Sequence, residues 1–227
     1  HFERLQDIAR LFAGLTLPEM QYIADKIPLM PFIREVVGKL KQQGYICILM
    51  SEGFDIVANH IKNKLGFDYC FANRLVMDKS VITGELQVPE YFLDKSEDKN
   101  RYQKNSLLSY ISVAFNIPEK NTVCISNAEQ DIPMLKSSGI GITTFDAPPS
   151  VQLCVDKIIP SFSLMPVLEL ISQKDNRIKI SPLKFATKNA VQFGLAAAVV
   201  SCCALYLLLR KRDTIKMPAE IVNTLIA

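Results

Sequence analysis

Short apolar runs alternate with amphipathic stretches between about residue 45 and residue 159. Residues 45–51 are apolar and β-branched, follow the turn residue Gly44, and form a run too short for a buried helix, which predicts a central strand. Residues 55–65 then carry apolar side chains at helical spacing. Strands that alternate with helices in this way build a parallel sheet. The pattern therefore predicts an α/β fold with a doubly wound, Rossmann-like sheet.

The other elements follow from the same spacing of apolar positions and from turn residues. Residues 78–80 predict the bend of a small hairpin, and Pro118 and Gly139 predict the ends of two helices. Further strands are predicted over 69–78, 81–86, 122–126, 140–145 and 155–159. Helices are predicted over 2–26, 32–43, 104–116 and 130–138.

A stretch without any charged residue extends over residues 189–209 and is rich in Ala, Leu and Val. It is bounded by Lys184 and Lys188 on one side and by residues 210–212, Arg-Lys-Arg, on the other. About 20 apolar residues span the hydrocarbon core of a bilayer, so the stretch predicts a C-terminal transmembrane helix. A buried core helix is the alternative. The flanking charges do not decide the topology.

Composition excludes several classes of protein. The 26 basic residues are scattered among 23 acidic ones, with a net charge of +3, so a nucleic-acid surface is not expected. The six cysteines lie in apolar runs without metal-ligand spacing, which predicts reduced thiols and neither a zinc site nor a disulfide framework. Reduced thiols favour a cytoplasmic α/β domain, held at the membrane by a single-pass anchor. The chain opens on His1 without the features of a signal peptide.

Three segments occur in a fixed order. Ser51-Glu52-Gly53-Phe54 follows a predicted strand, residues 65–75 contain Leu-Gly-Phe-Asp-Tyr-Cys-Phe-Ala-Asn, and Thr83-Gly84 comes next. This order resembles the haloacid-dehalogenase (HAD) superfamily, and within it the phosphoserine phosphatase branch, whose second motif reads Ser-Gly-Gly-Phe. The resemblance covers residues 2–170. It implies a phosphomonoester hydrolase that forms an aspartyl-phosphate, uses Mg²⁺, and acts on a small phosphorylated metabolite such as phosphoserine.

The resemblance also implies roles for individual residues. The Ser51 hydroxyl and the backbone N–H after it would hold phosphate oxygens, with Glu52 beside them, although a serine at a strand end is often only a cap. Lys104 would neutralise the phosphoryl oxygens. Lys95 and Lys99 are close to it in the sequence, and a solvated lysine at a helix start is the alternative for Lys104.

The metal motif of the family, Gly-Asp-Gly-x-Asn-Asp, is here Ser126-Asn127-Ala128-Glu129-Gln130-Asp131. Asp131 is kept and is expected to orient the metal shell, whereas Asn127 replaces the direct carboxylate ligand and should lower the affinity for Mg²⁺. Glu129 is a candidate to compensate. A second departure is Glu52, which replaces a glycine beside the phosphate, where its carboxylate would repel a dianion.

No Asp-x-Asp follows an apolar run, so the nucleophile is expected upstream of His1. The predicted organisation is a remnant of a helical cap, an α/β core without its first strand, a basic linker, a transmembrane helix and a short tail, over residues 1–27, 28–173, 174–188, 189–209 and 210–227. Two alternatives to an active enzyme remain. One is a degenerate, membrane-tethered scaffold or binding module, and the other is a gene fragment whose sheet has unpaired edges.

Overall fold

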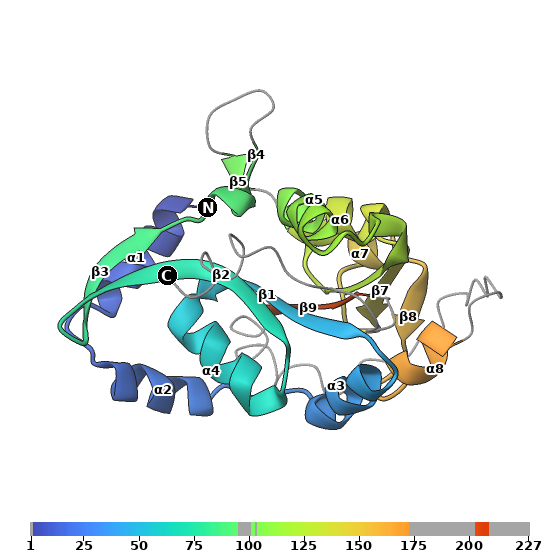
Figure 1. The fold of residues 1–227 in the computed structure, drawn as a ribbon, viewed down its shortest axis with the longest axis horizontal. Helices are drawn as coiled ribbons and strands as arrows, with labels where there is room; N and C mark the ends of the chain where they lie inside the picture. Colours follow the sequence, from blue (N-terminus) through green and yellow to red (C-terminus); the bar gives the residue numbers. More distant parts are fainter. Residues whose placement is uncertain (1, 95–100, 103, 173–202, 209–227) are drawn as a thin grey trace.

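The computed structural model describes residues 2–94, 101–102, 104–172 and 203–208. At its centre is a seven-stranded sheet with the strand order β3-β2-β1-β9-β6-β7-β8 (Figure 1). The strands of this sheet are β1 (Ile46–Phe54), β2 (Tyr69–Asp78), β3 (Val81–Gln87), β6 (Thr122–Ile125), β7 (Ile140–Thr144), β8 (Lys157–Ile159) and β9 (Cys203–Leu208). A separate two-stranded sheet joins β4 (Leu93–Asp94) to β5 (Arg101–Tyr102).

Two parallel blocks make up most of the large sheet. β1 pairs with β2 in parallel, and β6, β7 and β8 pair in parallel with one another. β3 is antiparallel to β2 and ends the sheet on one side, as the predicted hairpin requires. The parallel blocks confirm the Rossmann-like α/β fold that the sequence predicts.

β9 lies between the two blocks and runs against both of them. It is antiparallel to β1, from Ile46 opposite Leu208 to Ser51 opposite Cys203, and antiparallel to β6 on its other side. Its amino end therefore lies at the edge of the sheet where β1 ends. β9 is the strand that joins the blocks into one sheet.

The transmembrane helix predicted over residues 189–209 is wrong for Cys203–Leu208, which form β9. A short apolar run suits a buried strand as well as a helix, and periodicity does not separate the two. Residues 203–208 form a strand because they pair with β1 on one side and with β6 on the other. The other residues of 189–209, the basic linker 174–188 and the tail 210–227 lie outside the described residues. Among those described, no helix is long and apolar enough to cross a membrane.

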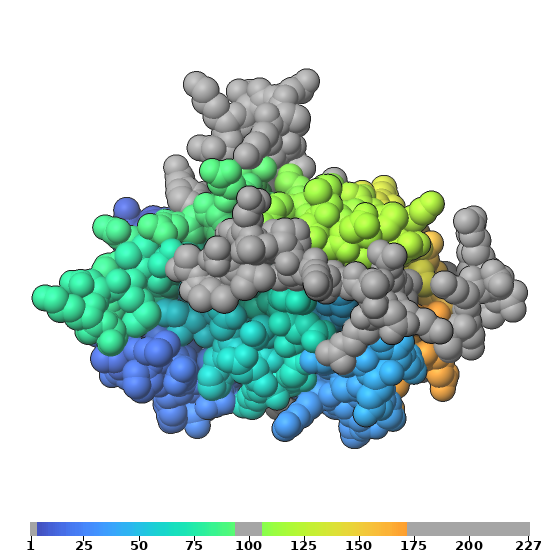
Figure 2. Space-filling view, in the orientation of Figure 1, coloured from blue at the N-terminus to red at the C-terminus, as the bar shows by residue number. Residues whose placement is uncertain are grey.

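Helices cover both faces of the sheet. One layer consists of α2 (Leu17–Asp25), α4 (Asp55–Leu65), α3 (Ile33–Gln42) and α8 (Val167–Ser172). The other consists of α5 (Lys104–Phe115), α6 (Ile132–Ser137) and α7 (Pro149–Gln152). In the space-filling view, α2, α4 and α3 follow one another along the lower side of the molecule, and α5 lies on the opposite side (Figure 2). The arrangement is the doubly wound one that the sequence predicts.

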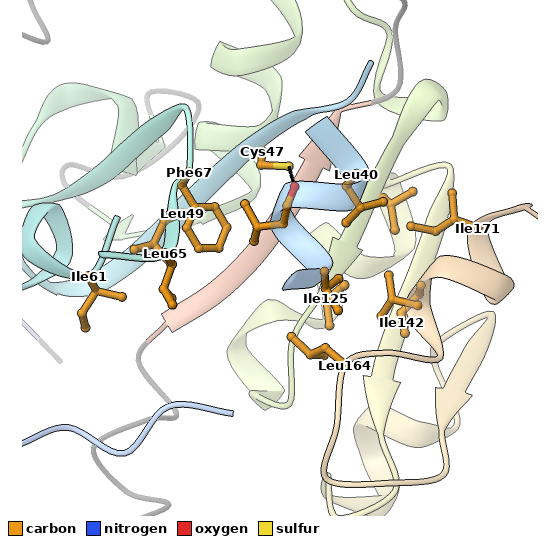
Figure 3. Packing of buried hydrophobic residues seen from close by; sticks show 14 of the residues in the cluster. Leu40, Cys47, Leu49, Ile61, Leu65, Phe67, Ile125, Ile142, Leu164 and Ile171 are labelled. Atoms are coloured by element: carbon orange, nitrogen blue, oxygen red, sulfur yellow. Dashed lines mark hydrogen bonds between the residues drawn. The ribbon is translucent and has the colours of Figure 1, made fainter. Parts of the chain in front are cut away.

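Alternate residues of the central strands enter different cores. On β1, Cys47 and Leu49 pack with α3, α4 and α8, whereas Ile48 and Met50 pack with α5, α6 and α7. Figure 3 shows the first of these cores, in which the Cys47 thiol also contacts the carbonyl oxygen of Val37. Side chains of a strand point alternately to opposite faces, so residues 47–50 of β1, which are buried between the two helical layers, are all apolar.

The helix predicted over residues 2–26 is interrupted. α1 (Phe2–Leu11) ends before Gly14, whose φ of 91° belongs to a left-handed conformation that favours glycine. α2 then begins after Thr16, whose backbone N–H donates to the Glu19 carboxylate at 2.8 Å in a capping box. The two helices and β3 enclose a third, smaller apolar core. Its buried members are Leu5, Ala9, Met20, Phe54, Leu75, Ile82 and Leu86.

Three short segments of the described chain form 3₁₀ helices. They are η1 (Glu90–Phe92), η2 (Glu119–Asn121) and η3 (Glu129–Asp131). η3 directly precedes α6 and follows the end of β6, so it lies at the same edge of the sheet as the end of β1.

Candidate functional site

Polar side chains gather at the carboxyl edge of the parallel strands. β1 ends with Ser51, Glu52, Gly53 and Phe54, β6 is followed by Ser126 and Asn127, and β7 ends with Thr143 and Thr144. Parallel strands bring their carboxyl ends to one edge, and ligands of open α/β sheets bind there. The structure thus brings four residues of the predicted site to the same edge. They are Ser51, Glu52, Asn127 and Asp131.

Ser51 is fixed in a tight turn at the end of β1. Its hydroxyl oxygen accepts a hydrogen bond from the Gly53 backbone N–H at 3.0 Å, and the residue is buried. A Cβ at position 53 would lie 3.2 Å from that hydroxyl oxygen, which explains why glycine suits the turn. The Ser51 hydroxyl therefore has a defined position beside the backbone of the turn.

Glu52 is buried, with only 2% of its surface exposed. Its backbone carbonyl accepts a hydrogen bond from Asn73 Nδ2 at 2.6 Å, which ties the turn to β2. Its carboxylate oxygen Oε2 lies 3.4 Å from Gln130 Nε2 on η3. β9 lies between β1 and β6 in the sheet. The contact between Glu52 and Gln130 therefore links the end of β1 to η3, which follows β6. The carboxylate is held in the site and does not turn out to solvent.

Asn127 is bound at both ends of its amide group. Oδ1 accepts hydrogen bonds from Thr143 Oγ1 at 3.1 Å and from the Thr144 backbone N–H at 3.2 Å. Nδ2 donates to Thr144 Oγ1 at 2.6 Å and lies 3.5 Å from Asp146 Oδ1. A backbone donor on one side and a carboxylate on the other fix the orientation of the amide. Asn127 thus links the end of β6 to the end of β7.

Asp131 is completely buried and is paired with the first residue of its own loop. Its Oδ2 accepts a hydrogen bond from Ser126 Oγ at 2.5 Å, and Ser126 Oγ accepts one from the Ala128 backbone N–H at 3.2 Å. A charge-assisted O–H···O⁻ hydrogen bond of this length is among the stronger ones in proteins. The pair keeps the loop after β6 in a fixed shape.

Two further acidic residues near the site have other partners. Glu129, the candidate to compensate for Asn127, accepts a hydrogen bond from Ser150 Oγ at the start of α7 and is exposed. Asp55 is the first residue of α4, and its Oδ1 accepts hydrogen bonds from the backbone N–H groups of Ile56 at 2.9 Å and Leu75 at 3.0 Å. Burial raises the pKa of the Asp55 carboxyl despite these donors. The compensating role predicted for Glu129 stays a prediction, and its contact with Ser150 does not support it.

Lys104 is the first residue of α5, as the sequence predicts for the lysine of the family motif. Its side chain lies outside the described part of the structure, as do Lys95 and Lys99. The choice among the three lysines therefore stays a prediction.

The described residues do not fit a magnesium site. Mg²⁺ prefers carboxylate and water oxygens in an octahedral shell. The Asn127 oxygen already accepts two hydrogen bonds, and Asp131 accepts one from Ser126. Within the described ranges, no group of three or more His, Cys, Asp or Glu side chains could hold a metal ion. The metal roles predicted for Asn127 and Asp131 stay predictions, and the hydrogen bonds of Asn127 count against its part.

Sequence reasoning missed the partners that fix the predicted residues. Asn73, Gln130, Thr143, Thr144 and Asp146 each contact a predicted site residue or its backbone. Asn73 belongs to residues 65–75, one of the segments on which the family resemblance rests. Its contact with Glu52 follows only from the pairing of β2 with β1. The threonines at the end of β7 carry no sequence signal of their own.

The fold and the site define a doubly wound α/β protein with a polar site at the carboxyl edge of its parallel strands. The model of the haloacid dehalogenase-like hydrolase family matches residues 3–136, more than half of the chain. The phosphoserine phosphatase of Methanocaldococcus jannaschii is 30% identical over 172 residues, which are 75% of this chain and 77% of that protein. The chain therefore belongs to the haloacid dehalogenase-like hydrolase family.

Other relatives and solved structures agree with this assignment. The phosphoserine phosphatase of Idiomarina loihiensis is 25% identical over 173 residues, 76% of this chain and 74% of that one. A phosphoserine phosphatase in its apo form superposes with a TM-score of 0.60 and 29% identity, covering 73% of this chain and 78% of that one. A substrate-bound phosphoserine phosphatase gives a TM-score of 0.60 and 28% identity, covering 74% and 76%.

Proposed function

We propose that the protein is a phosphoserine phosphatase-like hydrolase of phosphomonoesters, with phosphoserine as its substrate. The observation that carries the proposal is that Ser51 at the end of β1 and Asp131 on η3, motif residues far apart in the sequence, both lie at the carboxyl edge of the sheet, where Glu52 and Gln130 link the two segments. The named relatives are phosphoserine phosphatases, one of them with its substrate bound. These relatives favour an enzyme over the non-catalytic scaffold considered from the sequence.

In this proposal the residues at the end of β1 bind the phosphate. The Ser51 hydroxyl and the backbone N–H that follows it donate hydrogen bonds to phosphate oxygens, and Lys104 supplies positive charge. A carboxylate attacks phosphorus, the ester P–O bond breaks and serine leaves as the alcohol, so that an aspartyl-phosphate forms. Water then hydrolyses the aspartyl-phosphate, which releases inorganic phosphate and restores the carboxylate. A phospho-aspartyl intermediate analogue has been solved for a phosphoserine phosphatase that is 28% identical to this chain. The attacking carboxylate is proposed to belong to a segment upstream of His1.

Magnesium dependence is part of the proposal only as a family property. When bound, the ion would neutralise negative charge on the phosphate. Because the described residues do not provide its ligands, no step of the reaction is assigned to it.

The test is phosphate release from phosphoserine, measured on a form of the protein that carries the upstream segment. Ser51→Ala should lower kcat/KM by about 10²–10³, the usual effect of removing a preorganised donor to a developing negative charge. Ser109→Ala is the matched control, because Ser109 is exposed on α5 and donates to Glu119 at 2.6 Å, away from the site. Absence of phosphate release with the upstream segment present, or an equal loss in both variants, would contradict the proposal.

The described residues do not support the predicted attachment to a membrane through residues 189–209. A span needs about 20 residues, so the six residues of β9 cannot belong to the sheet and to a bilayer at the same time. Fractionation of native membranes, with alkaline extraction, decides whether the protein is membrane-integrated.

A further inference from the structure

The pairing of β1 with β2 is irregular at the turn that carries Ser51. In β1, residues 51–53 stand between the paired positions Met50 and Phe54, whereas β2 has a single residue between the two partners of those positions. A bulge of this kind takes backbone groups of the longer strand out of the hydrogen-bonded ladder. The shape of the turn is therefore held by contacts other than the ladder.

One peptide group of this turn, between Glu52 and Gly53, is bound at both of its ends. Its carbonyl oxygen accepts a hydrogen bond from Asn73 Nδ2 at 2.6 Å, and its N–H donates to Ser51 Oγ at 3.0 Å. The contacts form a chain in which the Asn73 amide is the first donor and the Ser51 hydroxyl oxygen is the last acceptor. Hydrogen bonds in such a chain polarise and strengthen one another, and the peptide group between them is planar and stiff. Asn73 thus fixes the position of the Ser51 oxygen through one peptide group.

The strand that carries Asn73 is itself held on both sides of this residue. The Tyr91 hydroxyl lies 3.4 Å from the Ala72 carbonyl oxygen, and the Leu75 backbone N–H donates to Asp55 Oδ1 at 3.0 Å. Asp55 begins α4 directly after the turn, so the turn and β2 are connected in both directions. The Asn73 side chain is completely buried, so it acts on a ligand only through the groups that it binds.

We propose that Asn73 is a positioning residue for phosphate binding, which holds the Ser51 hydroxyl where it donates to a phosphate oxygen. A donor that is already in place does not have to reorganise when the negatively charged ligand arrives, and this is what makes it effective. The inference rests on the proposed function only in that the site binds a phosphate group through Ser51, since it concerns binding and not turnover.

Replacement of the Asn73 amide by an apolar group of similar size separates this role from a purely structural one. Asn73→Leu removes the donor to the Glu52 carbonyl. Among the described residues, Asn73 Oδ1 is buried and has no hydrogen-bond partner. Leucine removes this unsatisfied atom as well, which offsets the loss of the hydrogen bond. The midpoint of urea unfolding should therefore stay close to that of wild type, whereas phosphate binding weakens.

A double-mutant cycle with Ser51→Ala measures whether Asn73 acts through Ser51. Wild type, the two single variants and the double variant, in the form of the protein used for the turnover assay, are titrated with inorganic phosphate by calorimetry. Each single change should weaken binding roughly tenfold, the usual loss for one hydrogen bond to a charged group. The double variant should bind within about threefold of Ser51→Ala, because Asn73 has nothing left to position when the hydroxyl is absent. Asn63→Leu is the matched control and should bind like wild type, because Asn63 is exposed on α4.

Three results would overturn the assignment. They are a wild-type protein that does not bind phosphate, an Asn73→Leu variant with wild-type affinity, and two losses that multiply to roughly a hundredfold in the double variant. If Asn73→Leu does not fold, Asn73→Asp takes its place in the cycle, since an ionised carboxylate has the shape of the amide but cannot donate. The expected pattern of phosphate binding, without phosphate release from phosphoserine, would leave Asn73 in its role and reject the proposed reaction.

Discussion

Gly139 lies where the chain leaves α6 and enters β7, pressed against the turn that precedes β6. A Cβ at this position would lie 1.9 Å from the carbonyl oxygen of Lys120 and 3.1 Å from that of Thr122. The Gly139 backbone N–H also donates to the carbonyl oxygen of Glu119 at 3.0 Å. Gly139→Ala therefore cannot be accommodated by side-chain movement, because the neighbouring atoms belong to the backbone. The start of β7 must move away from η2.

The cost follows from two terms. Forcing an extra carbon into a packed backbone contact costs about 1–3 kcal/mol. Displacement of Gly139 also weakens its hydrogen bond to Glu119, which is worth about 1 kcal/mol. The free energy of unfolding should therefore fall by about 2–4 kcal/mol, a large part of the 5–15 kcal/mol that is usual for a domain.

Gly38→Ala is the matched control, since Gly38 lies within α3 and a Cβ there meets no atom within 4 Å. The same chemical change should raise the free energy of unfolding by about 0.5–1 kcal/mol, because alanine loses less conformational freedom in a helix. Urea unfolding followed by circular dichroism measures both variants, as the chain contains no tryptophan. A Gly139→Ala variant within 0.5 kcal/mol of wild type would refute the packing argument.

Three further predictions concern other parts of the molecule. The hydrogen bond from Lys64 lowers the pKa of Asp25 to about 2 from 3.8, so its stabilising effect is complete above about pH 4 and is lost as the pH falls through 2. Asp25→Asn should remove this acid dependence from urea unfolding curves, and an unchanged dependence would contradict the assignment. Burial raises the pKa of the Cys47 thiol to about 12, so iodoacetamide at pH 8 should leave Cys47 unmodified in the native protein, as mass spectrometry of peptides would show. Asn127→Asp would place a carboxylate about 3.5 Å from that of Asp146 and should lower the free energy of unfolding by about 1–3 kcal/mol at pH 7. Unfolding at pH 4 should show a smaller loss, and a constant loss would point to packing instead.

The elements with a strong period could be predicted from the sequence. The helix predicted over residues 55–65 is α4, with the same bounds, and the strand predicted over 45–51 is β1, which continues through the site turn to Phe54. Local pattern suffices here because the part of β1 that is buried between two helical layers, residues 47–50, forms an unbroken apolar run. The local pattern did not reveal that the helix predicted over residues 2–26 is interrupted at Gly14, because the residues on both sides of Gly14 are helical and amphipathic.

The candidate site could be located from the sequence but not understood from it. The motifs predicted that Ser51 ends one strand and that Asp131 follows another, and in the structure both lie at the carboxyl edge of the sheet. The direction of the Glu52 carboxylate and the partners of Asn127 depend on which strands become neighbours, and no local pattern carries that information. β9 was assigned to a helix for the same reason, because strand pairing across the chain decides its conformation.

The central place of β9 has a consequence for the order in which the protein forms. The block β3-β2-β1 and the block β6-β7-β8 are each assembled from neighbouring stretches of chain, whereas the strand between them is made last during synthesis. Contacts between distant parts of a chain slow folding, and unpaired strand edges promote aggregation while they last. Among the described strands, β1 and β6 therefore gain the partner on their inner edges only when residues 203–208 have left the ribosome. The newly made protein is most dependent on chaperones until then.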